Sequence, residues 1–331
     1  MEPIILPRIS NQKPLVSVVS ITYNHEAFIR DCLEGFLMQK TNFPVEFIIH
    51  DDASTDHTAD IIREYYEKRP DLFHMIIERE NQYSLHNPIT LHVCGKAQGK
   101  YIALCEGDDY WTDPLKLQKQ YDFMEANSDY SCCIHNYYVC HTNKKAFPKK
   151  NIYISKKDIL LEDCLKNGTT DIKMCTVFFN KNVIDDFKTL RNGSPVGDYP
   201  LQLACVLNGK IYNMHETMSA CRFRTQGSWS DRTSNKDFLN KHITGQISWL
   251  EQIRGILNND DLVDIAIGKY WLWCSQNNEI MLKQNTCLQK YLKEKDALFR
   301  IKYAIWEITL PMHEIWKSIK RMIKKKLGRT P

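Results

Sequence analysis

Three carboxylates lie close together in the sequence, directly after an apolar run about a third of the way along the chain. Glu106, Asp108 and Asp109 follow residues 101–105 (YIALC), and Gly107 separates the first two acids. Neighbouring carboxylates disfavour one another's ionisation, so we expect a positive group among them when the protein works. Carboxylate oxygens suit Mg²⁺ and Mn²⁺, and Mg²⁺ is commonly shared with substrate phosphates. The cluster predicts such a metal site; the alternative is a surface turn, where aspartate is common.

Polar residues also follow two apolar runs closer to the N-terminus. They are Thr22, Tyr23 and Asn24 at the end of residues 16–22 (VSVVSIT), and Asp51 and Asp52 after residues 46–50 (EFIIH). A ligand that touches all three polar groups requires the three runs to end at one edge of a common sheet.

The first 130 residues predict that arrangement, because apolar runs alternate with stretches that suit helices. The expected strands are residues 16–22, 46–50, 73–77 and 101–105, and the expected helices lie in residues 25–39, 54–67 and 89–97. This order predicts an α/β fold with a mostly parallel sheet flanked by helices. Runs that are apolar throughout are typical of strands covered on both faces. Ligands of such sheets bind at the carboxyl ends of the strands, so the three polar groups should meet.

The alternation is looser beyond residue 130. We expect strands at residues 131–140 and 174–179, a loop at 142–151, short helices from Val183 and Asp198, and helices over 236–326 that break at Asn258-Asn259 and Pro311. The expected parts of the chain are residues 1–232, a helical extension of residues 233–310 and a basic amphipathic helix of residues 311–331.

The composition indicates a globular protein. The 331 residues are 43% hydrophobic and 25% charged, and none of the runs approaches the roughly 20 apolar residues that span a bilayer. The N-terminus does not read as a signal peptide. Twelve cysteines are scattered through apolar runs without a C-x-x-C pair. We interpret them as reduced core residues of a cytoplasmic protein.

The positive charge of the chain is concentrated at its C-terminus. Residues 316–329 contain seven Lys and Arg and no acid, whereas the whole chain has a net charge of +4. Apolar residues there recur every three or four positions, which predicts a basic amphipathic helix on the inner, anionic face of a membrane. The alternatives are a helix docked on the protein's own core and, third, a nucleic-acid contact, for which the chain carries no recognised motif.

Three segments resemble the family 2 glycosyltransferases, which have the Rossmann-like GT-A fold. They are VSVVSITYNHEAFIRDCLEGFLMQK, VEFIIHDDASTDHTADII and GKYIALCEGDDYWTDPLKLQKQYDFME. The likeness is ordered over roughly residues 14–130 and continues more weakly through GDYPLQLACVLNGKIYNM and SACRFRTQGSWS. It implies an inverting hexosyl- or N-acetylhexosaminyl-transferase with a nucleotide-sugar donor, usually a UDP-sugar, and Mn²⁺ or Mg²⁺.

The resemblance also implies roles for individual residues. Thr22 and Tyr23 would hold the uracil, with Asn24 beside them. Asp52 would accept the uracil N–H, with Asp51 beside it. Asp108 would contact the ribose or the metal, and Asp109 would bind the metal. Glu106 takes the first acidic place of the family's D-x-D pattern. Asp198 falls where these enzymes keep the catalytic base, although an aspartate at a helix start is also a favoured cap.

One position departs from the family. Arg224 stands where a histidine that helps to hold the metal or diphosphate is often found. A protonated arginine does not ligate a metal, but it can fork onto phosphate oxygens, so we expect Arg222 and Arg224 to contact the diphosphate. The alternative is a pair of solvated surface arginines.

The chemistry agrees with a transferase that builds a cell-surface glycan on a glycan or lipid-linked acceptor. A metal neutralises the diphosphate that leaves, and a separate carboxylate takes the proton of the attacking hydroxyl. Two other functions stay open: a nucleotidyltransferase, whose Gly-rich basic loop is missing after the first strand, and a membrane-associated nucleotide-sugar-binding protein without turnover.

Overall fold

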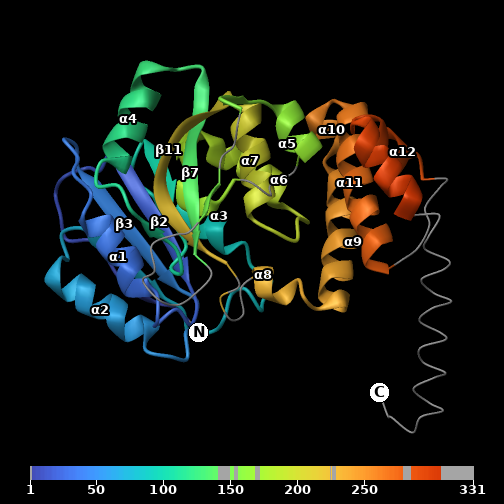
Figure 1. Cartoon of the computed structure of the whole chain (residues 1–331). Helices are drawn as coiled ribbons and strands as arrows, with labels where there is room; N and C mark the ends of the chain where they lie inside the picture. Colours follow the sequence, from blue (N-terminus) through green and yellow to red (C-terminus); the bar gives the residue numbers. More distant parts are fainter. Residues whose placement is uncertain are drawn as a thin grey trace, which may run out of the picture. The chain divides into compact units, whose positions relative to one another are not determined.

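The computed structural model describes residues 2–140, 150–152, 156–167, 172–223, 225, 229–278 and 285–306. The chain divides into two compact units, the first reaching Ser234 and the second beginning at Asn235. Figure 1 shows the strands and helices of the first unit in blue to yellow and those of the second in orange to red. None of the helices in the described ranges has both the length and the apolar character needed to cross a membrane.

One mixed sheet organises the first unit. Its strands are β1 (Ile4–Leu6), β2 (Val16–Thr22), β3 (Val45–Asp51), β4 (Phe73–Ile77), β5 (Tyr101–Leu104), β6 (Tyr110–Trp111), β7 (Tyr130–Cys140), β8 (Lys150–Ile152), β9 (Asp158–Ile159), β10 (Phe178–Asn180) and β11 (Lys210–Arg222). Their order is β1-β4-β3-β2-β5-β10-β7-β11-β6, and β8 and β9 pair with β7 and β11. Strands β4, β3, β2 and β5 are parallel neighbours, as are β7 and β11. The strand order reverses at β2, where open α/β sheets bind their ligands.

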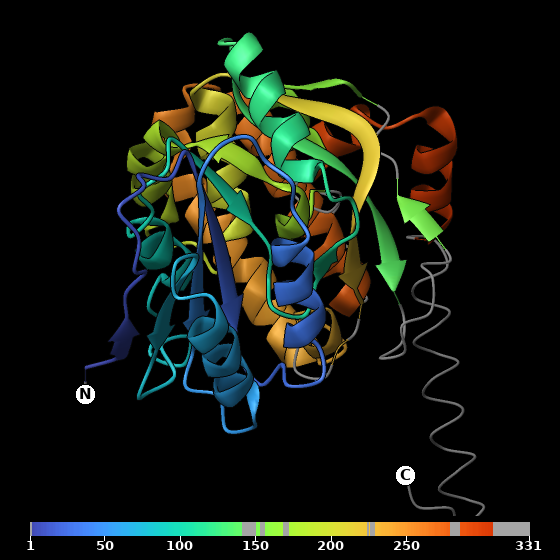
Figure 2. The same cartoon turned by 90° about the vertical axis from the view of Figure 1, so that its left-hand side faces the viewer.

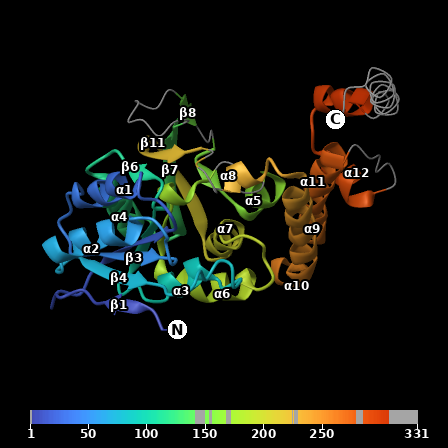
Figure 3. The same cartoon turned by 90° about the horizontal axis from the view of Figure 1, so that it is seen from below.

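Helices cover both faces of the sheet. Helices α1 (Ile29–Leu37), α2 (Thr58–Lys68) and α4 (Lys116–Ala126) share one apolar core with β2 to β5. Figure 2 looks toward this face, with the blue helices α1 and α2 in front. On the other face lie α3 (Ile89–Cys94), α6 (Ile184–Arg191) and α7 (Asp198–Leu207), which Figure 3 shows side by side; α5 (Leu161–Asn167) packs on α7. A right-handed crossover from β4 to β5 puts α3 on this second face.

The expected fold class is confirmed, and most expected strands agree with the structure to within a residue or two. The strand expected at residues 174–179 is wrong in its first half, which is a 3₁₀ turn, Met174–Thr176, before β10. The turn forms because the backbone N–H and the hydroxyl of Thr176 both donate to the Lys173 carbonyl, at 2.9 and 2.7 Å. The loop expected at residues 142–151 ends in strand β8, and its earlier residues lie outside the described ranges.

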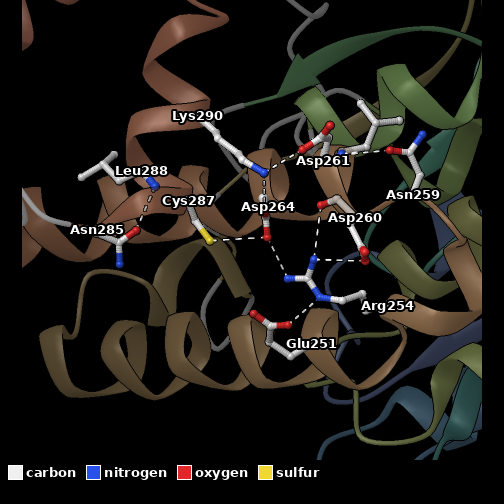
Figure 4. Close-up of polar contacts among 11 residues, drawn as sticks. Glu251, Arg254, Asn259, Asp260, Asp261, Asp264, Asn285, Cys287, Leu288 and Lys290 are labelled. Carbon is white, nitrogen blue, oxygen red and sulfur yellow. Dashed lines mark hydrogen bonds and ion pairs between the residues drawn. The ribbon is translucent and has the colours of Figure 1, made fainter.

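The second unit is helical. Its helices are α9 (Lys236–Gln252), α10 (Arg254–Leu257), α11 (Asp260–Asn278), α12 (Thr286–Lys293) and a last helix over residues 297–306; α8 (Trp229–Arg232) precedes the unit. Asp264 of α11 accepts from Arg254 at 2.8 Å and from Lys290 at 2.6 Å, so one carboxylate ties three helices together (Figure 4). The expected helix of residues 311–331 lies outside the described residues.

Candidate active site

The carboxylate cluster occupies a tight turn between β5 and β6. One carboxylate oxygen from each of Glu106, Asp108 and Asp109 lies within 4.8 Å of the other two. A Cβ atom on Gly107 would stand 2.7 Å from the hydroxyl of Thr22. Only glycine therefore lets the turn approach the end of β2, and this contact brings two of the expected polar groups together.

A bound cation would stabilise the ionised forms of the carboxylates in this turn. Glu106 lines the pocket described below and is exposed there, but desolvation by the surrounding protein and the charges of Asp108 and Asp198 raise the pKa of Glu106 to about 7. Burial, with the nearby Cys221 and Asp108, raises the pKa of Asp109 well above its usual range. Without a cation the cluster would hold protons at neutral pH. Three hard oxygen donors this close fit a divalent ion, which Asp108, Asp109 and Glu106 would hold.

Arg222, at the end of β11, holds this turn in place. Its backbone N–H donates to Asp109 at 2.8 Å, its Nη1 donates to the Asp108 carbonyl at 2.6 Å, and its Nη2 pairs with Asp31 at 2.6 Å. The guanidinium also lies between the rings of Phe28 and Tyr110, 4.9 and 4.7 Å from their centroids. Arg222 is thus buried and engaged by the protein, unlike a solvated surface arginine; its contact with a diphosphate stays a prediction.

Beyond Arg222 the chain returns to the cluster at Thr225. The hydroxyl of Thr225 donates to the Asp108 carboxylate at 3.0 Å and orients it. This contact was not predicted, because nothing in the sequence distinguishes Thr225 from other polar residues of the segment. Arg224 lies outside the described residues.

The residues expected to hold the nucleotide base surround the ends of β2 and β3. Tyr23 is 44% exposed, which leaves its ring open to a planar ligand. Asn24 has a left-handed backbone (φ 54°), and its side chain accepts from the Thr55 N–H at 2.8 Å. Asp51 accepts from the backbone N–H and hydroxyl of Ser54, at 3.0 and 2.5 Å. The two strand-end loops are therefore fixed to each other by hydrogen bonds.

Asp52 anchors the loop that follows β4. Its two carboxylate oxygens accept from the backbone N–H groups of Gln82 and Tyr83, at 2.6 and 3.1 Å, and its own N–H donates to the Thr22 carbonyl at 2.9 Å. Tyr83 then lies under the guanidinium of Arg232, 4.9 Å from the ring centroid, and its hydroxyl accepts from Arg232 at 2.9 Å. The loop and helix α8 thus form one rim of the site.

A single pocket of about 380 Å³ joins the carboxylate cluster to Asp198. Asp198 is the first residue of α7, and its carboxylate accepts from the Tyr199 N–H at 2.8 Å. The cap position of the helix is occupied by Gly197. Burial raises the pKa of Asp198, while Lys173 and Arg191 oppose that rise. The same pocket therefore contains a separate carboxylate in addition to the candidate metal site.

Comparison with known proteins identifies the chain. The model of glycosyl transferase family 2 matches residues 17–187. An uncharacterized protein of Mycobacterium tuberculosis is 33% identical over 259 residues, which cover 78% of this chain and 73% of the relative. The chain belongs to glycosyltransferase family 2. The family and the enzyme class expected from the sequence are confirmed.

Two further proteins relate to this family 2 glycosyltransferase. An Escherichia coli protein, UDP-Glc:alpha-D-GlcNAc-diphosphoundecaprenol beta-1,3-glucosyltransferase WfaP, is 31% identical over 175 residues, 52% of this chain and 61% of the relative. The crystal structure of S. aureus TarS 1-349 in complex with UDP-GlcNAc matches with a TM-score of 0.56 at 16% identity, covering 84% of this chain and 78% of that chain. The second likeness concerns the fold.

The sequence did not single out several residues that line or brace the pocket of this glycosyltransferase. They are Asp31, Tyr83, Lys173, Arg191, Thr225 and Arg232. The one available signal was Lys173, a cation placed directly before an apolar run. All twelve cysteines are free, and all but Cys221 and Cys287 are buried, as expected for core residues.

Proposed function

We propose that this enzyme is an inverting glycosyltransferase that transfers a sugar from a UDP-sugar to a hydroxyl of a glycan or lipid-linked acceptor in cell-surface polysaccharide synthesis. The observation that carries the proposal is that one pocket is lined both by the cluster of Glu106, Asp108 and Asp109 and by the separate carboxylate of Asp198. A transfer of this kind needs both functions: charge neutralisation at the diphosphate and a base at the acceptor.

The donor would bind at the ends of β2, β3 and β5. The exposed ring of Tyr23 would pack on the uracil, while Thr22, Asn24, Asp51 and Asp52 would shape the base and ribose site. Asp108 and Asp109, with Glu106, would hold Mn²⁺ or Mg²⁺, which neutralises the diphosphate. Arg222 would keep these carboxylates in position, and together with Arg224 it would face the diphosphate.

The acceptor would approach from the side of Asp198. Its hydroxyl oxygen forms the new bond to the anomeric carbon while the bond from that carbon to the diphosphate oxygen breaks, and the bonding electrons leave with UDP. The proton of the hydroxyl goes to the carboxylate of Asp198. Attack on the face opposite the nucleotide inverts the anomeric centre. A double displacement would need an additional nucleophile, and we assign none among the described residues that line the pocket.

The names of relatives support this choice of substrates. The E. coli relative is named for UDP-glucose and a diphosphoundecaprenol-linked acceptor, and TarS was crystallised with UDP-GlcNAc. A lipid-linked acceptor would place the enzyme at a membrane surface.

UDP release tests the proposal. The purified protein is incubated with Mn²⁺ and each of a panel of UDP-sugars, with and without acceptor glycans. We expect UDP release with at least one donor, and its loss in Asp109→Ala and Asp198→Ala. UDP binding without release on any acceptor, or release that persists in both variants, would contradict the proposal.

We also propose that the C-terminal part of the chain rests on the cytoplasmic face of an anionic membrane. In the helix of residues 297–306, Tyr303 and its neighbours pack inward, but Leu298, Ile301 and Ile305 are 60%, 55% and 55% exposed on the other side. A helix that is apolar on two sides usually has a second partner. The exposed cations Arg300 and Lys302 and the basic residues 316–329 suit anionic lipid.

Vesicle sedimentation tests this contact. The full chain should sediment with vesicles of phosphatidylglycerol and phosphatidylcholine more than with phosphatidylcholine alone. The Leu298→Glu, Ile301→Glu double variant should lose that binding while keeping its circular dichroism spectrum. Equal sedimentation of the variant and the parent protein would remove this surface from the proposal.

A further inference from the structure

Two cations line the Asp198 side of the pocket. Lys173 stands just before the 3₁₀ turn Met174–Thr176, and its carbonyl accepts two hydrogen bonds from Thr176, so its backbone is fixed. Arg191 is the last residue of α6, and its Nη1 donates to the Ser194 carbonyl in the loop that leads to Asp198. Both residues border the same 380 Å³ cavity as the proposed base.

Neither cation has an ion-pair partner within 4.0 Å in the described ranges of the chain. The contrast with Arg222 is direct, because Arg222 lines the same pocket but pairs with Asp31 at 2.6 Å. Desolvation by the surrounding protein lowers the pKa of Arg191, which means that the protein destabilises the charged form of the guanidinium. A cation that is partly desolvated and lacks an ion pair is suited to receive an anion from outside.

The position of the cations indicates which substrate brings that anion. Among the carboxylates that line the pocket, Asp198 is the one that acts appreciably on the charge of Arg191; Glu106, Asp108 and Asp109 do not. Lys173 lines the same pocket, and its charge acts on both Glu106 and Asp198. A diphosphate held at Asp108 and Asp109 by a metal is already neutralised there. The positive charges of Arg191, beside Asp198, and of Lys173, which acts on Asp198 as well as on Glu106, are therefore available to the acceptor.

We propose that Lys173 and Arg191 form an anion subsite for the acceptor, which carries a phosphate or carboxylate group close to the attacked hydroxyl. This inference rests on the proposed function, because it uses Asp198 to define the acceptor side. The guanidinium can fork onto two oxygens of either group, and the lysine supplies a point charge that follows the anion. Acceptors with these groups are a sugar diphosphate attached to an alkyl chain and a uronic acid.

Matched acceptors test the subsite. One sugar is offered as its neutral methyl glycoside, as the corresponding methyl uronoside and as an alkyl diphosphate, with Mn²⁺ and the donor that gives UDP release. The proteins compared are the parent chain, Lys173→Gln, Arg191→Gln, the conservative Arg191→Lys, and Arg63→Gln, an exposed arginine of α2, as control. Acceptor KM, kcat and the dissociation constant for UDP with Mn²⁺ are measured for each.

We expect one anionic acceptor to have a KM at least ~10-fold below that of the neutral glycoside, since charge-assisted hydrogen bonds are the strong ones. Lys173→Gln and Arg191→Gln should remove this advantage, Arg191→Lys should restore part of it, and UDP binding should stay within about twofold. The anionic acceptor that has the lower KM shows whether the subsite binds a diphosphate or a uronic acid.

Three results would overturn the subsite: equal KM for neutral and anionic acceptors, weakened UDP binding in the glutamine variants, or a shifted pH profile with unchanged acceptor KM. Weakened UDP binding would assign Lys173 and Arg191 to the donor site. A shifted pH profile with unchanged acceptor KM would mean that they act only on the pKa of Asp198. Absence of UDP release from every donor in the parent protein would instead refute the proposed function.

Discussion

Arg222 and Asp31 form an ion pair with an Nη2–Oδ2 distance of 2.6 Å, although 191 residues separate them in the chain. The Arg222 side chain is 5% exposed and that of Asp31 20%. The pair joins the end of β11 to α1, and the same arginine holds the backbone of Asp108 and the carboxylate of Asp109. The turn that carries the carboxylate cluster is therefore braced by elements from both ends of the first unit.

Arg222→Gln should lower the free energy of unfolding by about 3 kcal/mol, because it removes a buried guanidinium that pairs with the partly buried Asp31 and donates to the Asp108 carbonyl. Chemical denaturation measures the change. The matched control is Arg30→Gln, which breaks an exposed pair with Glu64 and should cost less than about 1 kcal/mol. Equal effects of the two substitutions would contradict a structural role for Arg222.

Asp108→Asn and Asp109→Asn should weaken Mn²⁺ binding by roughly 100-fold, since each removes a charged ligand from a three-carboxylate cluster. Titration calorimetry in the presence of UDP measures the affinity. Asp113→Asn is the control, because Asp113 lies four residues further along and pairs with Lys119. If both cluster variants bind Mn²⁺ like the parent protein, the metal site lies elsewhere.

Asp198→Asn should reduce kcat by about 10²–10⁴ while the affinity for UDP with Mn²⁺ is retained, because a general base acts on the acceptor and not on the donor. Steady-state kinetics and calorimetry separate the two effects. Asp186→Asn, on the exposed side of α6, serves as the control. A parallel loss of UDP binding would place Asp198 in the donor site.

The pKa of Glu106 predicts how the metal-free protein responds to pH. Its pKa rises from 4.5 to about 7 on folding, so the folded state binds this proton more tightly than the unfolded state. The stabilising contribution is complete below about pH 4.5 and is lost as pH rises through 7. Melting curves should therefore show a decline between these values that is smaller in Glu106→Gln, while the raised pKa values of Asp109 and Asp198 preserve part of it.

Mn²⁺ should reverse that decline. Metal binding competes with the protons of the cluster, so Mn²⁺ affinity should increase from pH 6 to pH 8, and the metal should raise the melting temperature more at pH 8. A Mn²⁺ affinity that is the same at both values would show that Glu106 is not part of the metal site.

The sequence predicts the parallel part of the sheet well because strands β2 to β5 are short apolar runs bounded by helical stretches. It does not predict β11, whose residues 210–222 mix Asn213, His215 and Glu216 with apolar side chains. The structure explains this mixture: the register of β11 with β7 shifts between Asn213 and Thr217, and His215 has a left-handed backbone (φ 58°). A bulged strand lacks a regular alternation.

In the candidate active site, too, some features could be predicted from the sequence and others could not. The carboxylate cluster was predictable because three acids after an apolar run are rare and chemically specific. The ion pair of Arg222, the hydrogen bond of Thr225 and the pocket position of Arg191 depend on which distant strands become neighbours. Local residue patterns contain no information on those contacts, so they required the three-dimensional structure.

The hydrogen bonds of Asp52 to Gln82 and Tyr83 have an evolutionary consequence. They attach one rim of the pocket to the sheet through backbone amides, which any residue except proline supplies. Apart from Asn81, whose side-chain amide donates to the Asp52 carbonyl at 3.0 Å, the side chains of this loop can vary without loss of these hydrogen bonds. We expect exchange of residues 82–88 between family members that share the aspartate to change the lining of the pocket at Tyr83 and Asn87 while the loop stays attached to the sheet.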